Sequence, residues 1–247
     1  MNTLPVEQAV FTSSDRGPIK GYQLVSRSMG IDRGVSAELC RWAPTRVASE
    51  RADDWTLNCF PVGDGLVAIT RTTLGGPEYS GRGGTQVVTL ILVLRSEQLQ
   101  GYEFNSLAVA RTAMAMGHLK LPLDVECEPL PPVKLPAYPI SDSACSIGSD
   151  LAGQRDSSDQ EESLLRQVTA LISDGRRVAI AGNVDPIVTV NRLIQRLPLD
   201  IRRSFSFTTG LAPSVRRPFQ VHFFAAVDLP MQHSLDSQNV VCLTVPK

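Results

Sequence analysis

The sequence has 247 residues, of which 43% are hydrophobic and 20% are charged, and its formal net charge is −1. This composition is typical of a folded protein and argues against extended disorder, while the nearly neutral charge argues against nucleic acid as a partner. The N-terminus has neither region of a signal peptide, and no apolar run reaches the roughly 20 residues that span a bilayer. We therefore expect a cytoplasmic protein that does not contact a membrane.

The five cysteines stand alone in the sequence, and none of them forms a CxxC pair. An odd number of isolated cysteines favours reduced, mostly buried thiols over a disulfide framework or a zinc site. We therefore expect neither a metal ion nor another cofactor.

Two antiparallel hairpins are predicted in the first third of the chain. Residues 6–12 and 21–28 form the first, in which alternating apolar and polar side chains leave one face exposed to solvent. Residues 55–61 and 66–72 form the second, because the Asp64-Gly65 step between them favours a tight turn. A short helix over residues 36–42 separates the two hairpins, with Ser36 as its expected N-cap.

The strongest strand signal in the chain is the run QVVTLILVL, residues 86–94. Continuous apolar runs rich in β-branched residues are typical of strands that are buried on both faces. We expect this strand to be the centre of the sheet.

The loop before this strand, from Gly75 to Gly84, contains five glycines. Glycines allow backbone N–H groups to surround a phosphate, but this loop lacks the P-loop ending and the GxGxxG spacing of nucleotide sites. It is either a ligand-binding loop or a long hairpin connection. Arg82, at its tip, is correspondingly either a binding residue or a solvated charge.

A change in composition near Glu128 predicts the domain organisation. Residues 106–116 form the last predicted helix of an N-terminal mixed α/β lobe, residues 1–128, and Gly117 ends that helix. Five prolines then fall between residues 129 and 139, followed by a stretch rich in Ser, Asp and Gly. We interpret residues 129–159 as a linker, which leaves residues 160–247 as a smaller C-terminal lobe.

The C-terminal lobe is predicted to alternate helices and strands. An apolar stripe indicates a helix from Gln160 that Gly175 ends, and a strand over residues 177–182 follows. Asp185 and Pro186 open a second helix, a basic segment covers residues 200–204, and strands are expected at 205–209, 219–227 and 240–245. The fold class is therefore α+β, with an antiparallel-rich sheet covered by helices and followed by a smaller α/β lobe.

Two features of this lobe can each be interpreted in two ways from the sequence. The turn at Gly182 is either the ligand turn of an α/β site or a tight connection between strand and helix. Arginine pairs recur at residues 176–177, 202–203 and 216–217. They form either one basic face that contacts phosphate or an acidic protein, or scattered solvated charges.

The sequence offers little support for catalysis. Neither a GxSxG elbow nor an HExxH motif occurs, and the three histidines are His118, His222 and His233. A Cys59–His222 pair stays open as a nucleophile and base, although only the residue types suggest it. We favour a binding protein over an enzyme and leave an enzyme or a nucleotide or small-ligand sensor, with its site at the Gly75 to Gly84 loop or the Gly182 turn, as the alternative.

Three stretches together resemble the type 2 N-terminal domain of the GTPase-associated proteins found in bacterial conflict gene clusters. They are EQAVFTSSDRGPIKGYQLVSRSMGI at residues 7–31, Arg71 with the GRGG loop and the apolar strand up to Leu94, and LPLDIRRSFSFTTG at residues 197–210. The resemblance extends over residues 7–227.

The resemblance implies a non-catalytic adaptor or regulatory module that works beside a GTPase in an NTP-dependent defence system. It leads us to expect partner contacts at Arg71, Arg82, Arg202 and Arg203. Relatives often carry a histidine in the core strand, near the place of Thr89 in this chain, and they often have further domains. If that histidine matters in relatives, this chain has lost it.

Overall fold

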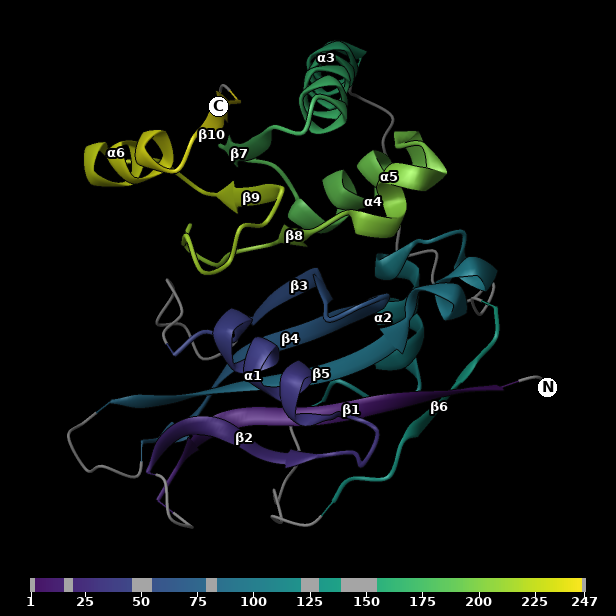
Figure 1. Ribbon diagram of the computed structural model, residues 1–247. Helices are drawn as coiled ribbons and strands as arrows, with labels where there is room; N and C mark the ends of the chain where they lie inside the picture. Colours follow the sequence, from purple (N-terminus) through teal and green to yellow (C-terminus); the bar gives the residue numbers. More distant parts are fainter. Residues whose placement is uncertain are drawn as a thin grey trace.

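A single mixed sheet forms the framework of the molecule (Figure 1). The computed structural model describes residues 3–15, 20–45, 55–78, 84–120, 129–138 and 155–245, with the backbone alone for 155–158. The strands are β1 (Thr3–Ser14), β2 (Gly21–Arg27), β3 (Trp55–Val62), β4 (Leu66–Pro77), β5 (Thr85–Arg95), β6 (Val133–Pro136), β7 (Arg177–Ala181), β8 (Phe207–Thr208), β9 (Val221–Phe224) and β10 (Val240–Thr244). The helices are α1 (Arg33–Trp42), the 3-10 helix η1 (Ser96–Tyr102), α2 (Ser106–Ala115), α3 (Arg155–Ser173), α4 (Pro186–Arg196), α5 (Leu199–Ser204) and α6 (Leu229–Ser237).

The strand order is β10-β7-β9-β8-β3-β4-β5-β1-β2, and β6 pairs with β1 outside this path. All pairs among β1 to β6 are antiparallel, as is the β3–β8 pair, whereas β7, β8, β9 and β10 pair in parallel. The predicted α+β class, with an antiparallel-rich sheet and a smaller α/β part, is confirmed.

The predicted core strand is confirmed as β5, which lies between β4 and β1. Every residue of β5 from Val87 to Leu94 is buried. Alternate side chains enter two different cores: Leu90 and Leu92 lie in one, and Ile91 and Val93 lie in the other. The run is continuously apolar because both faces of the strand are covered.

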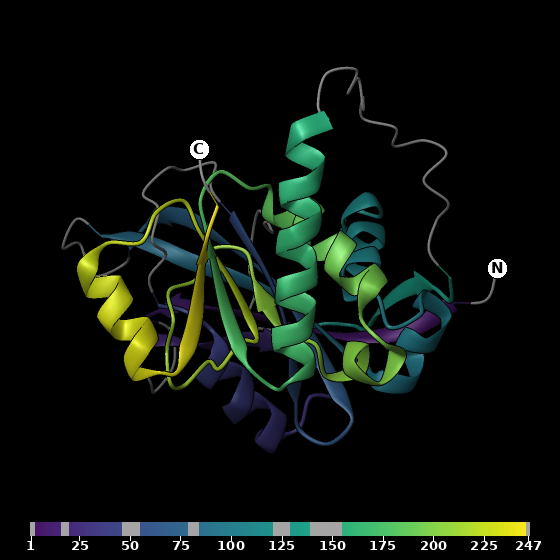
Figure 2. The same cartoon turned by 90° about the horizontal axis from the view of Figure 1, so that it is seen from above.

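Helices cover the two faces of the sheet unequally. Side chains of α2, α3 and α4 share the larger core with Leu90, whereas α1 covers the opposite face through Val35, Leu39 and Trp42. A small third core forms under α6, which Figure 2 shows on the other side of β7 and β10 from α3. We call these two sides of the sheet the α3 face and the α1 face.

Some element boundaries and several whole elements differ from the prediction. Helix α1 begins at Arg33, and its N-cap is Asp32 instead of Ser36, since the Asp32 carboxylate accepts a hydrogen bond from the Val35 amide at 2.8 Å. Helices η1 and α6 were not predicted. The Asp228 cap of α6 and the proline that follows form a start signal that the sequence does contain.

The segment interpreted as a linker contains structure at both ends. Residues 133–136 form β6, and the hydroxyl of Tyr102 donates to the carbonyl of Pro136 at 2.7 Å. Helix α3 begins at Arg155, and residues 139–154 lie outside the described residues. The sheet itself continues from one part of the chain to the other through the β3–β8 pair, so the division into two lobes stays a proposal about folding units.

Candidate functional site

Arg71 is a partly buried residue of β4 that packs against its own protein. Its guanidinium carbon lies 4.9 Å from the ring centroid of Trp55, and Nη1 donates to the carbonyl of Leu119 at 3.0 Å. Its Nε is buried without a hydrogen-bond partner, and burial lowers the pKa of this guanidinium. Arg71 therefore connects β4 to the segment after α2.

The two arginines of α5 differ in what they contact. Arg202 donates to the carbonyls of Leu197 at 2.7 Å, Gln195 at 3.0 Å and Glu103 at 3.4 Å, and its side chain is only 15% exposed. These bonds hold α5 against the end of α4 and the turn after η1. These contacts give Arg202 a structural role within the protein.

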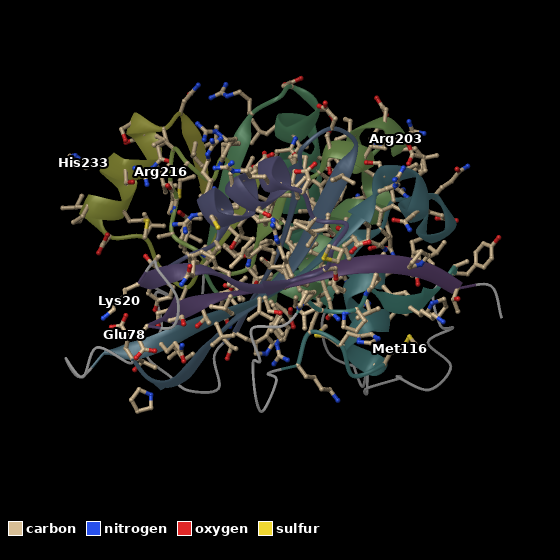
Figure 3. The ribbon with its side chains drawn as sticks, turned by 60° about the horizontal axis from the view of Figure 1, so that its bottom comes forward. Lys20, Glu78, Met116, Arg203, Arg216 and His233 are labelled. Atoms are coloured by element: carbon tan, nitrogen blue, oxygen red, sulfur yellow. The ribbon has the colours of Figure 1, made fainter. Side chains whose placement is uncertain are left out.

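Arg203 is exposed, and its guanidinium carbon lies 4.6 Å from the ring centroid of Phe104 (Figure 3). A cation over an aromatic ring keeps several donor N–H groups directed outward. Of this pair, Arg203 is the residue with a side chain that a partner can reach.

The fourth predicted residue, Arg82, lies outside the described residues, because these stop at Glu78 and resume at Gly84. The amide of Glu78 donates to the carbonyl of Gly84 at 2.8 Å, which closes the base of the loop. Arg71 contacts Trp55 and Leu119, whereas Arg202 and Arg203 contact the turn after η1. The predicted residues thus do not converge on one described site.

The turn at Gly182 is tightly packed. Its φ is 133°, and a Cβ there would lie 2.5 Å from the carbonyl oxygen of Val245. Its amide donates to the carbonyl of Phe224 at 3.0 Å and is already used. This geometry favours the tight connection over a phosphate-binding turn.

Cys59 and His222 point to opposite faces of the sheet. Cys59 pairs with Phe207, which pairs with Val221, and all three lie in the core of the α3 face. His222 is the next residue along β9, so its side chain lies on the α1 face. Burial raises the pKa of the Cys59 thiol to about 12, which disfavours the reactive thiolate. The two residues do not form a nucleophile and base pair.

Thr89, near the position at which the resemblance places a histidine, is buried in β5 on the α1 face. Its hydroxyl lies 3.0 Å from the hydroxyl of Thr72, its cross-strand neighbour in β4. The position is occupied by a paired hydroxyl and not by a titratable group.

A cleft of about 540 Å³ lies beside one end of the antiparallel sheet, and sequence reasoning missed it. Its apolar lining comes from β1, α1, β4 and β5, and its charged lining consists of Glu7, Asp32, Asp64, Glu97 and Arg95. We call it the acidic cleft. Four carboxylates against one guanidinium give it a negative charge at neutral pH.

The walls of the acidic cleft are fastened to one another by hydrogen bonds. The amide of Ser96 donates to the carbonyl of Gly65 at 2.8 Å, and Gln98 Nε2 donates to the carbonyl of Pro5 at 2.9 Å. The amide of Gly63 donates to the carboxylate of Glu38 on α1 at 2.7 Å. The cleft is therefore formed before any partner arrives.

Glu7 is the most enclosed of the cleft's carboxylates. Its Oε2 is buried without a hydrogen-bond partner, and the carboxylate lies against the Cα of Gly30, where a Cβ would be 2.4 Å from Oε1. A buried carboxylate oxygen without a donor favours a ligand that brings one. No sequence pattern indicates this cleft, because its carboxylates come from four separate segments.

The family described as GTPase-associated protein 1, N-terminal domain type 2, matches residues 5–133 of the chain. The chain belongs to this family. The matched residues include Arg71, β5 and every residue that lines the acidic cleft, but not Arg202, Arg203 or the stretch at residues 197–210. The resemblance inferred from sequence is confirmed for its first two stretches.

No curated protein matches the chain. In the described part of the chain, none of the helices is both long enough and apolar enough to cross a bilayer. No group of three or more His, Cys, Asp and Glu side chains suited to a metal ion occurs among the described residues.

Proposed function

We propose that this member of the family is a non-catalytic adaptor or regulatory module that binds a GTPase of a bacterial NTP-dependent conflict system. The observation that carries the proposal is the match of residues 5–133 to a domain described as GTPase-associated. Because GTPases draw on the nucleotide pool of the cytoplasm, we also propose a cytoplasmic location.

The acidic cleft supports this proposal by offering a preformed contact surface within the family-matched residues. Its apolar lining suits the aliphatic part of a long basic side chain, and its carboxylates suit the charged end. We propose that a Lys or Arg side chain of the GTPase enters the cleft.

Arg203 is the second proposed contact. Its guanidinium lies over Phe104 in the turn after η1, while Glu97 and Gln98 at the start of η1 line the cleft. An exposed arginine on an aromatic ring is typical of residues that contribute strongly to interfaces. Arg71 and Arg82 are also proposed contacts, and Arg71 would have to meet the partner while it is held by Leu119 and Trp55.

A pull-down against the products of the neighbouring genes, among which we expect a GTPase, tests the proposal. The tagged chain is expected to capture the GTPase, and the captured amount is expected to differ between GTP and GDP. Capture of the GTPase in neither nucleotide state would refute the adaptor function. A thermal-shift assay of the chain alone with GTP distinguishes the sensor alternative, because a ligand at 100 times its Kd stabilises by about 2.7 kcal/mol.

A further inference from the structure

Two basic side chains that each have one buried nitrogen without a hydrogen-bond partner lie close to β9 on the α1 face. His222 is 1% exposed, and its Nδ1 is buried without a hydrogen-bond partner. Arg217 is partly buried, and its Nε is likewise buried without a partner. Neither residue belongs to the acidic cleft or to the family-matched segment.

The backbone brings Arg217 back toward β9. Its amide donates to the carbonyl of Ser214 at 3.0 Å, and its carbonyl accepts from the amide of Phe219 at 2.9 Å, so the chain turns tightly before the strand. The ring of Phe219 stands edge-on to the imidazole of His222, with 5.8 Å between centroids. Arg217 is thereby held over the same part of the sheet as His222.

Arg177 supplies a third positive group. His222 pairs with Ala179 of β7, so Arg177, two residues earlier in β7, lies on the same face as His222 and diagonal to it. One of its Nη atoms donates to the carbonyl of Gln238. Burial, and then the charges of Arg177 and Arg217, lower the pKa of His222 to about 4, against the effect of backbone hydrogen bonds with Leu211 and Phe219.

Arg217 and Arg177 have no ion-pair partner among the described residues. The ion pairs within 4.0 Å in the described part of the chain belong to Arg192, Arg196 and Arg202, and none involves Arg217 or Arg177. A partly buried guanidinium is normally paired with an anion, because removing a charge from water is unfavourable. Burial also lowers the pKa of Arg217.

We infer that Arg217 and Arg177, on either side of His222 in the fold, form a binding site for a phosphate group. The guanidinium of Arg217 presents several N–H groups in the planar arrangement that suits phosphate oxygens, and Arg177 adds charge. The imidazole of His222, which is buried and hydrogen-bonded to the backbone at Leu211 and Phe219, lies beside these arginines and reports on the site without binding the phosphate itself. The phosphate is either the inorganic ion or part of a nucleotide, and the site does not depend on the proposed GTPase partner.

Calorimetric titration of the purified chain with sodium phosphate, at ionic strength fixed with chloride, tests the site. Arg217→Gln is the test variant, and Arg216→Gln is its matched control, since Arg216 is the adjacent residue and is exposed (Figure 3). We expect saturable binding by the wild type and by Arg216→Gln, and a loss of about tenfold or more in Arg217→Gln, as a lost charge-assisted hydrogen bond predicts. A parallel titration with GTP shows whether the preferred phosphate is free or nucleotide-borne.

The three histidines give a second readout that does not require a variant. In ¹⁵N-labelled wild-type protein, phosphate is expected to shift the imidazole signals of His222 and to leave those of His118 and His233 unchanged. This spectrum decides the question if Arg217→Gln fails to fold. Equal binding by both glutamine variants, equal shifts at all three histidines, or binding that does not saturate would mean an adventitious ion only and would overturn the site.

Discussion

The hydroxyl of Thr208 donates to Oδ1 of Asn58 at 2.6 Å, across the strand pair that joins the antiparallel and parallel parts of the sheet. Both side chains are fully buried, and Asn58 Nδ2 donates onward to the hydroxyl of Thr70 at 3.0 Å. Strand β8 is two residues long, so few backbone bonds hold this junction. Side-chain hydrogen bonding therefore contributes to the continuity of the sheet.

Replacing Thr208 by Val should destabilise the fold by about 1–3 kcal/mol, because it leaves the Asn58 carbonyl buried without a donor. The free energy of unfolding from urea denaturation measures this effect. Ser237→Ala, which removes an exposed hydroxyl at the end of α6, is the control and should change stability by less than about 0.5 kcal/mol. Equal stability of the two variants would contradict a role for the junction.

The adjacent arginines of α5 should behave oppositely on substitution. Arg202→Ala removes hydrogen bonds to three carbonyls and is expected to cost about 1–3 kcal/mol of folding free energy. Arg203→Ala removes an exposed cation–π contact and is expected to cost about 1 kcal/mol or less, while weakening capture of the GTPase. Loss of stability in Arg203→Ala with full stability in Arg202→Ala would reverse this assignment.

His222 should make stability depend on pH below neutrality. Its pKa falls from 6.5 to about 4 on folding, so the unfolded chain binds the proton more readily. The stabilisation that comes from neutral His222 is fully present above the unfolded pKa of 6.5. It is lost as the pH falls from 6.5 through about 4, which lowers the free energy of unfolding by up to about 3 kcal/mol.

The comparison of wild type with His222→Phe isolates this effect, because other groups titrate equally in both. The stability difference between them should shrink or reverse as the pH is lowered from 7 to about 4. Exposed His233→Gln is the control and should follow the wild type across the same range. A difference that stays constant with pH would contradict the depressed pKa of His222.

Cys59 should resist alkylation in the folded protein. It is 1% exposed, and burial raises its pKa to about 12, whereas Cys40 and Cys242 are only partly buried. Because the thiolate is the reactive form, iodoacetamide should label Cys59 only after unfolding. Peptide mass spectrometry measures the label, and rapid native labelling of Cys59 would contradict the burial.

The sequence predicts the sheet better than it predicts the surfaces. Strand β5 is predictable because β-branched residues recur without interruption between two covered faces. Strand β6 is not, since it is short, contains a proline, and forms only by pairing with β1, which is far away in the sequence. Helix α5 appears in the sequence only as a short basic segment.

The acidic cleft could not be predicted, because its carboxylates at residues 7, 32, 64 and 97 meet only through strand pairing and packing. The sequence also does not distinguish the roles of adjacent residues. Arg202 and Arg203 are the same residue type in one helix, but successive helical positions point about 100° apart. One arginine therefore faces carbonyls and the other faces solvent. The family could be predicted because the resemblance depends on whole stretches of sequence and not on the orientation of single side chains.

The most direct test of the adaptor proposal is the affinity of the purified chain for its proposed partner, a GTPase from a neighbouring gene, measured by calorimetry in the GTP state. The test variant neutralises two exposed carboxylates of the acidic cleft, Asp64→Asn with Glu97→Gln, and the control neutralises two exposed carboxylates elsewhere, Asp174→Asn with Asp200→Asn. We expect the cleft variant to bind about tenfold or more weakly and the control to bind like the wild type. Wild-type affinity in the cleft variant would contradict the cleft as the contact, and absence of binding by the wild type would contradict the adaptor function itself.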